Sequence, residues 1–158
     1  MQIEFHALPK HAVAAIRQSG TDHLGLPVEQ CAPDAEGFLC RHCLSTIGPD
    51  QPYLTLAYRP FETLNPYSET GPLFLCTDCE QAAPTAQAPA VLNAPNYLIK
   101  GYTADERIRY GTGVIVPNAE LATRARAILA DPEIAFVDVR SAANNCFQCR
   151  IKRAVPVE

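Results

Sequence analysis

Apolar and polar residues alternate at the start of the chain, and this alternation predicts a half-buried strand. Between residues 2 and 8 the apolar side chains occupy every second position. Successive side chains of a strand point to opposite faces, so this spacing collects the apolar ones on one face. Pro9 then opens a predicted helix over 11–18, whose apolar residues crowd one side. Gly20 follows at the place of a C-terminal cap.

The middle of the chain contains two further apolar runs separated by turn residues. Residues 21–37 are rich in glycine and proline and predict a loop, which carries Cys31. Apolar runs predict strands at Tyr53–Tyr58 and at Leu73–Cys76. Residues 82–95 are rich in Ala, Pro, Gln and Thr, and this composition predicts a surface loop.

The last third of the chain predicts a hairpin, a helix and two strands. Residues 97–102 and 108–110 have the pattern of two arms around a polar turn. Apolar residues at intervals of three and four predict a helix that starts at 117–118 and ends before Asp131. Strands over 134–139 and 146–151 complete the chain.

The order of these elements is neither repeated nor strictly alternating, and it predicts an α+β fold with a mainly antiparallel sheet and two helices. A chain of 158 residues that is 47% hydrophobic has enough apolar residues for one core and is short for two. We therefore expect a single domain over 1–158, with 82–95 as a surface loop.

Charge and apolar run length narrow the possible partners. The chain has 13 basic and 17 acidic residues and a formal net charge of −4. This balance argues against nucleic acid, which is bound through many contacts from cations to phosphates. No apolar stretch approaches the roughly 20 residues needed to cross a bilayer, so no membrane partner is expected. The first residues lack the pattern of a signal peptide, and we expect a cytoplasmic protein.

Seven cysteines carry the clearest chemical signal. Six of them form Cys-x-x-Cys pairs, namely Cys40 with Cys43, Cys76 with Cys79 and Cys146 with Cys149, and Cys31 stands alone. An odd number fits poorly with a complete set of disulfides, and in a reducing compartment such pairs bind metal or act in redox chemistry. Two sulfurs three residues apart on a turn can face one ion, so the first two pairs predict a zinc site.

Two alternatives to that ligand set stay open. The four thiols can be free and buried, or one ligand can come from the last pair. Cys146 and Cys149 reach one ion together only if their strand bends, because residues three apart on a strand point to opposite faces. Cys149 is therefore the alternative ligand, completing a site whose other ligands come from the central segment.

Several short segments together give the chain a resemblance to a known family. They are Phe-Leu-Cys-Arg-His-Cys-Leu at 38–44, Tyr-Arg-Pro-Phe at 58–61, Pro-Tyr-x-x-x-Gly-Pro at 66–72, Lys-Gly-Tyr at 100–102 and the run from Val139 to Arg150. In this order they resemble the bacterial domain-of-unknown-function family 1203 over nearly the whole chain. The resemblance implies no assigned reaction. It also implies that some members have His where Cys76 stands, which exchanges one zinc ligand for another.

Two functions of different classes follow from these residues. The first is a cytoplasmic zinc-binding domain whose metal is structural and which binds a protein or a small ligand. A set of five side chains is the candidate ligand pocket: Arg41, His42, Arg59, Tyr67 and Arg140. The alternative is a thiol oxidoreductase or metal-dependent enzyme that uses the segment 40–43, where Arg41 and His42 would favour a thiolate at Cys40. The sequence leaves open whether the protein is an enzyme.

Overall fold

The computed structural model describes residues 1–33 and 37–155. The elements in chain order are β1 (Ile3–His6), α1 (Lys10–Ser19), β2 (Glu29–Cys31), β3 (Phe38–Leu39), β4 (Thr46–Ile47), β5 (Tyr53–Tyr58), β6 (Gly71–Cys76), β7 (Asn96–Thr103), β8 (Val114–Pro117), the 3-10 helix η1 (Asn118–Glu120), α2 (Leu121–Leu129), β9 (Ile134–Ser141) and β10 (Phe147–Arg153). The predicted α+β class is confirmed, with mainly antiparallel sheets and two α-helices among the described residues.

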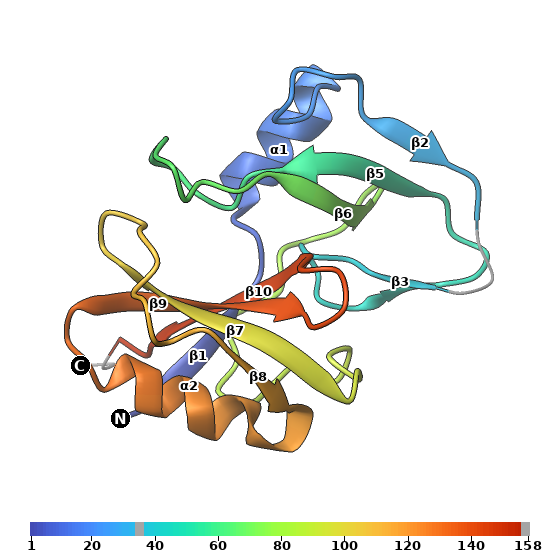
Figure 1. The fold of residues 1–158 in the computed structure, drawn as a ribbon. Helices are drawn as coiled ribbons and strands as arrows, with labels where there is room; N and C mark the ends of the chain where they lie inside the picture. Colours follow the sequence, from blue (N-terminus) through green and yellow to red (C-terminus); the bar gives the residue numbers. More distant parts are fainter. Residues whose placement is uncertain (34–36, 156–158) are drawn as a thin grey trace.

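The larger sheet has five strands in the order β1-β10-β9-β7-β8, and every neighbouring pair is antiparallel. Helix α2 packs on one face of this sheet (Figure 1). Its buried residues Leu121, Ala125 and Leu129 repeat at four-residue intervals, which is the spacing of one helix face. They meet Ile99 of β7 and Val139 of β9 in one apolar core.

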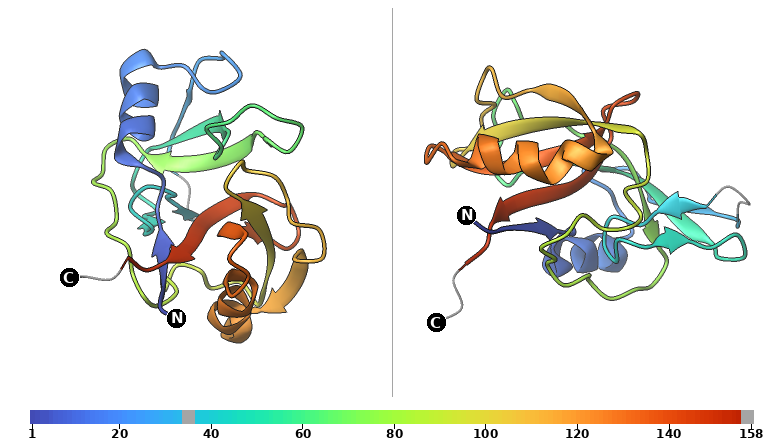
Figure 2. Two further views of the ribbon diagram at one scale, coloured as in Figure 1. Left: turned by 90° about the vertical axis from the view of Figure 1, so that its left-hand side faces the viewer. Right: turned by 90° about the horizontal axis from the view of Figure 1, so that it is seen from below.

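The smaller sheet has three antiparallel strands in the order β2-β5-β6. Helix α1 packs against it through Val13 and Ile16, which are buried in a second apolar core with Leu54 and Leu75. Gly20 ends α1 with φ 67°, a left-handed conformation that glycine adopts without strain, so the predicted cap is confirmed. Figure 2 shows α1 and α2 at opposite ends of the molecule.

The short β3–β4 pair lies beside both sheets, and Arg41 fastens it there. Its backbone N–H donates to Phe74 O of β6 at 3.2 Å, and its carbonyl accepts from Leu8 N at 2.9 Å. The Arg41 guanidinium donates through Nε to Phe147 O of β10 at 2.9 Å. This guanidinium is buried, and its desolvation lowers the pKa of Arg41 to about 10.

Two sequence predictions are corrected by the pairing of the strands. The strand that forms a hairpin with β7 is β8, whereas residues 108–110 make only the single bridge from Ile108 to Tyr102. The polar turn at Thr103 forms as predicted, but the chain turns again at Gly111, with φ 90°, before the pairing strand begins. The predicted loop 21–37 contains β2, whose side chains are exposed or half-buried and so give no alternating pattern.

Residues 34–36 of that predicted loop lie outside the described residues, as do 156–158. The segment 82–95 contains none of the named strands or helices, but it is tied to the larger sheet. Thr85 pairs with Phe5, and Leu92 is 4% exposed within the core. The single-domain organisation stays a prediction. In the part of the chain that the structure describes, the helices are too short to cross a bilayer.

Candidate metal centre

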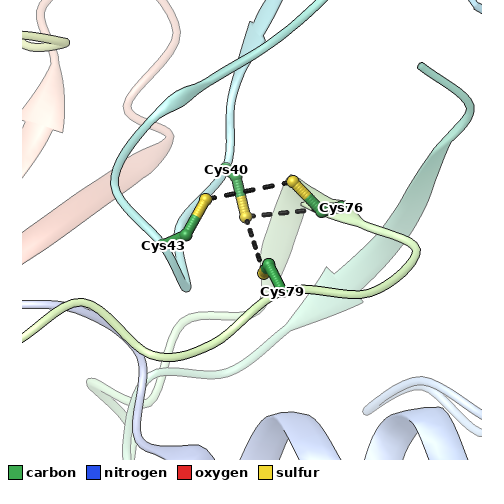
Figure 3. A group of neighbouring side chains, drawn as sticks. All are labelled: Cys40, Cys43, Cys76 and Cys79. Atoms are coloured by element: carbon green, nitrogen blue, oxygen red, sulfur yellow. Dashed lines mark hydrogen bonds between the residues drawn. The ribbon is translucent and has the colours of Figure 1, made fainter.

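The structure brings together Cys40, Cys43, Cys76 and Cys79, whose Sγ atoms all lie within 4.8 Å of one another (Figure 3). The Sγ atoms of Cys40 and Cys79 are 3.7 Å apart, and those of Cys43 and Cys76 are 3.9 Å apart. The first pair comes from the turn between β3 and β4, and the second from the end of β6 and the turn that follows it. The two pairs therefore face each other across the cluster.

The turn that carries the first pair reverses at Leu44. Leu44 N donates to Cys40 O at 2.9 Å, and Cys40 N donates to Ser45 O at 3.0 Å. Leu44 has φ 50°, a left-handed conformation that costs a side chain with Cβ free energy and that glycine would adopt freely. Its side chain is 9% exposed and packs in the core of the five-stranded sheet. Burial of Leu44 thus offsets the strain of the turn.

Two of the six distances between the sulfurs match the edge of a tetrahedron around one metal ion, and the others are at most 4.8 Å. A zinc–sulfur bond is about 2.3 Å, so two sulfurs on a tetrahedral ion lie about 3.8 Å apart. The measured separations of 3.7 and 3.9 Å fit that edge. A disulfide would need about 2.05 Å. The residues present therefore fit a metal ion held by four thiolates.

Burial opposes the ionisation of these thiols, and hydrogen bonds decide which of them ionises most readily. Cys40 is fully buried, yet N–H groups of Cys43, Cys76 and His42 keep the pKa of its thiol below the usual value. Burial raises the pKa of the Cys79 thiol to about 11, although Arg17 opposes the rise. Burial and the charge at Cys40 also raise the pKa of Cys76. A bound cation would overcome the opposition of burial to ionisation, because it stabilises every thiolate.

Arg17 of α1 is a part of the site that the sequence did not reveal. Its Nη2 donates to Cys79 Sγ at 3.2 Å and to Cys76 O at 3.0 Å, and its Nη1 donates to Cys79 O at 3.1 Å. The Nδ1 atom of His42 lies 3.4 Å from the same sulfur. Arg17 lies 62 residues from Cys79 in sequence, and no spacing rule connects the two.

The remaining cysteines lie outside this cluster. Cys149, the alternative ligand, is fully buried in the core of the five-stranded sheet, where burial raises the pKa of its thiol. Cys146 Sγ contacts Asn144 O at 3.8 Å, and Cys31 Sγ lies 3.5 Å from Thr55 Oγ1. Within 1–33 and 37–155 the group able to hold a metal ion consists of the four clustered cysteines and does not include Cys149.

The five side chains of the predicted ligand pocket do not come together. Arg41 and His42 are buried on the β3–β4 turn, beside β10 and the cysteine cluster respectively. Tyr67 contacts Tyr110, with their hydroxyl oxygens 3.2 Å apart. Arg59 and Arg140 line two different cavities. The sequence groups these residues by their type, as side chains suited to an anionic ligand, whereas the fold separates them.

Fold and site together define a small α+β protein in which two Cys-x-x-Cys turns form a cluster that can hold a metal ion. A family model described as "Protein of unknown function (DUF1203)" matches residues 37–153, and the chain belongs to this family. This confirms the resemblance identified from the sequence. No curated protein matches the chain. No solved structure matches it either.

Proposed function

We propose that this protein is a cytoplasmic zinc-binding domain in which the zinc is structural and a small molecule is the ligand. The observation that carries the zinc assignment is the convergence of four cysteine sulfurs within 4.8 Å. Four thiolates in tetrahedral geometry suit zinc or iron–sulfur chemistry. Such a set leaves no open coordination position, which favours a structural role over a catalytic one. The odd number of cysteines supports a reducing compartment.

The zinc would join the β3–β4 turn to the end of β6. Cys40 and Cys43 hold the β3–β4 turn, while Cys76 and Cys79 hold the end of β6. Zinc with four thiolates carries a net charge of about −2, which is costly to bury without compensation. Arg17 supplies a cation at Cys79 Sγ, and through the Cys76 and Cys79 carbonyls it attaches α1 to the same turn.

The oxidoreductase alternative needs an exposed thiolate that another disulfide can reach. Cys40 is 0% exposed, and the side chains of Arg41 and His42 are directed away from its sulfur. Arg41 donates to Phe147 O and Leu39 O, and His42 Nδ1 faces Cys79. These contacts support the structural assignment over disulfide exchange.

Metal analysis of protein purified without added metal tests the assignment. We expect about one zinc ion per chain, because four thiolates fill one tetrahedral site. Cys76→Ser should lose the metal, whereas Cys146→Ser, in the unclustered pair, should keep it. Less than about half an equivalent in fully reduced protein contradicts the proposal. So does loss of metal from Cys149→Ser with retention in Cys40→Ser. Rapid modification of Cys40 before chelation, with a reversible Cys40–Cys43 disulfide, would establish the oxidoreductase instead.

Arg17→Met should weaken zinc binding without removing a ligand. Groups that hydrogen-bond to metal ligands change metal affinity by about 10–100-fold when they are removed, and methionine keeps the unbranched apolar stem of the side chain without its donors. Competition with a chromophoric chelator measures the affinity. Arg124→Met, on the exposed face of α2, removes the same charge and serves as the control. Equal zinc affinities in the two variants would contradict the role of Arg17.

A further inference from the structure

A cavity of about 450 Å³ lies where α1, the segment after β5 and the strands β1 and β10 meet. In Figure 1, α1 and the smaller sheet lie above β10 and β1, the two strands that complete the cavity. Six basic or imidazole side chains line it: His6, His11, His23, Arg59, Arg150 and Lys152. The chain has four histidines, so three of them are gathered here. Glu62 is the one acidic residue that lines it among the described residues.

The first turn of α1 opens onto this cavity. Pro9, His11 and Ala12 are among the lining residues, and α1 is 10 residues long. Its N-cap residue, Pro9, makes no side-chain capping hydrogen bond, and its first turn has no acidic residue. Gln81 Oε1 accepts from Lys10 N at 3.2 Å. A helix N-terminus carries partial positive charge and N–H donors without helical partners, and both attract an anion.

The charged side chains add to the positive field of the helix. Neither Arg59 nor Lys152 forms an ion pair with any of the residues that the structure describes. Arg150 is already paired with Asp138, at 2.7 Å from Nε to Oδ1. The two cations without an acidic partner are therefore Arg59, from the segment after β5, and Lys152, from β10.

Two of these histidines, His6 and His23, have pKa values lowered by burial and by neighbouring cations. Burial lowers the pKa of His6, and Lys152 lowers it further, although Glu4 opposes the shift from 3.5 Å. Burial and then Arg59 lower the pKa of His23. An imidazole that loses its proton more readily beside cations is suited to act as a neutral hydrogen-bond donor.

Backbone contacts also orient His23. Its Nδ1 accepts a hydrogen bond from Arg59 N at 2.8 Å, so in the neutral ring the proton is on Nε2. The ring stacks on Tyr58, with centroids 4.5 Å apart. His23 is thus held with one donor atom left for a ligand. The histidines do not form a metal site, since the group able to hold an ion in the described ranges is the cysteine cluster.

We propose that this cavity binds the phosphate group of a small phosphorylated organic molecule. A phosphate monoester carries up to two negative charges and three terminal oxygens, which match a helix N-terminus together with two unpaired cations and neutral imidazole donors. The volume lies within the range of about 300–1,000 Å³ typical of small-molecule pockets. Leu8, Tyr58, Phe61 and Phe147 also line the cavity and provide apolar surface for the organic part.

This inference names the ligand class of the proposed domain, but it rests on the cavity and not on the zinc. The cavity lining includes none of the four clustered cysteines. Zinc content measured on each sample therefore separates the two proposals: phosphate binding by protein that lacks zinc would leave this inference standing. Binding failure in protein with full zinc would overturn this inference alone.

Titration calorimetry on the purified full chain tests the site with phenyl phosphate, inorganic phosphate and benzoate as probes. We expect phenyl phosphate to bind most tightly, because it offers both the anion and an apolar ring. Arg59→Gln and Lys152→Gln should each weaken its binding by about tenfold or more, since hydrogen bonds to charged groups contribute about 1.5–3 kcal/mol. Arg124→Gln removes the same charge from an exposed position on α2 and should leave the affinity unchanged.

Three outcomes would overturn the proposal. The first is no binding of phenyl phosphate or inorganic phosphate at millimolar concentration. The second is benzoate binding as tightly as phenyl phosphate, which would assign the cavity to carboxylates. The third is equal weakening by Arg124→Gln, which would reduce the binding to a nonspecific effect of net charge. Circular dichroism of each variant confirms that the comparison is between folded proteins.

Discussion

Removing the proposed zinc ion with a chelator should lower the melting temperature of the protein by roughly 10 °C. An ion that binds only the folded state contributes about 4 kcal/mol when its free concentration is 1,000 times its Kd. For a chain of 150–250 residues each kcal/mol shifts the melting temperature by about 2–4 °C. Isolated zinc fingers unfold completely without their metal. We expect a smaller effect here, because each sheet has its own apolar core.

Removal of the metal should disorder the turn between β3 and β4 before it unfolds the rest of the protein. Strands β3 and β4 have two residues each, so the turn between them depends on the metal more than the five-stranded sheet does. Hydrogen exchange after chelation should show faster exchange at Cys40 N and Leu44 N than at the amides of β9. Calorimetric melting of the zinc-loaded and chelated protein measures the overall effect, with Cys31→Ser as a control that keeps its zinc. Unchanged melting after verified zinc removal would exclude a structural role for the metal.

Asp138→Asn should be the most destabilising conservative substitution in the larger sheet. Asp138 is 0% exposed and accepts from Arg150 at 2.7 Å through Nε and at 3.0 Å through Nη2. The Arg150 guanidinium lies 3.6 Å from the centroid of the Phe136 ring, and its Nη2 also donates to Pro60 O. Loss of one partner from a buried ion pair costs about 3–5 kcal/mol, because the other charge stays buried without compensation.

A second ion pair in the same protein offers a matched control. Asp105 lies 3.2 Å from Arg107, but their side chains are 66% and 50% exposed. Exposed pairs contribute little to stability, so Asp105→Asn should have a small effect on the free energy of unfolding. Urea unfolding of both variants measures the difference. Replacing both buried partners, as in Asp138→Asn with Arg150→Met, should restore part of the stability. Equal destabilisation by Asp138→Asn and Asp105→Asn would contradict the argument.

Much of the fold follows from patterns within short stretches of sequence. The alternation at Ile3–His6 predicts a strand because successive side chains of a strand point to opposite faces, and the apolar run at Tyr53–Tyr58 predicts another. The stop at Gly20 follows from the left-handed conformation that glycine allows. The cysteine spacing predicts each half of the cluster for the same local reason, since each pair lies on one turn. In each case the information lies within about ten residues.

Features that depend on distant segments had to come from the tertiary structure. Strand β8 replaces 108–110 as the partner of β7 because two successive turns, not one, set the register. Arg17 reaches Cys79 across 62 residues, and an arginine on a half-buried helix position has no sequence pattern that distinguishes it from a surface one. The cationic cavity joins α1 to β10, so its composition depends on packing alone. Sequence by itself therefore determined both α-helices, the strands β1, β5, β6, β7, β9 and β10, and the residue type of the candidate metal ligands. The fold decided which charges surround the cysteines and the cavity, because packing brings residues together irrespective of their separation along the chain.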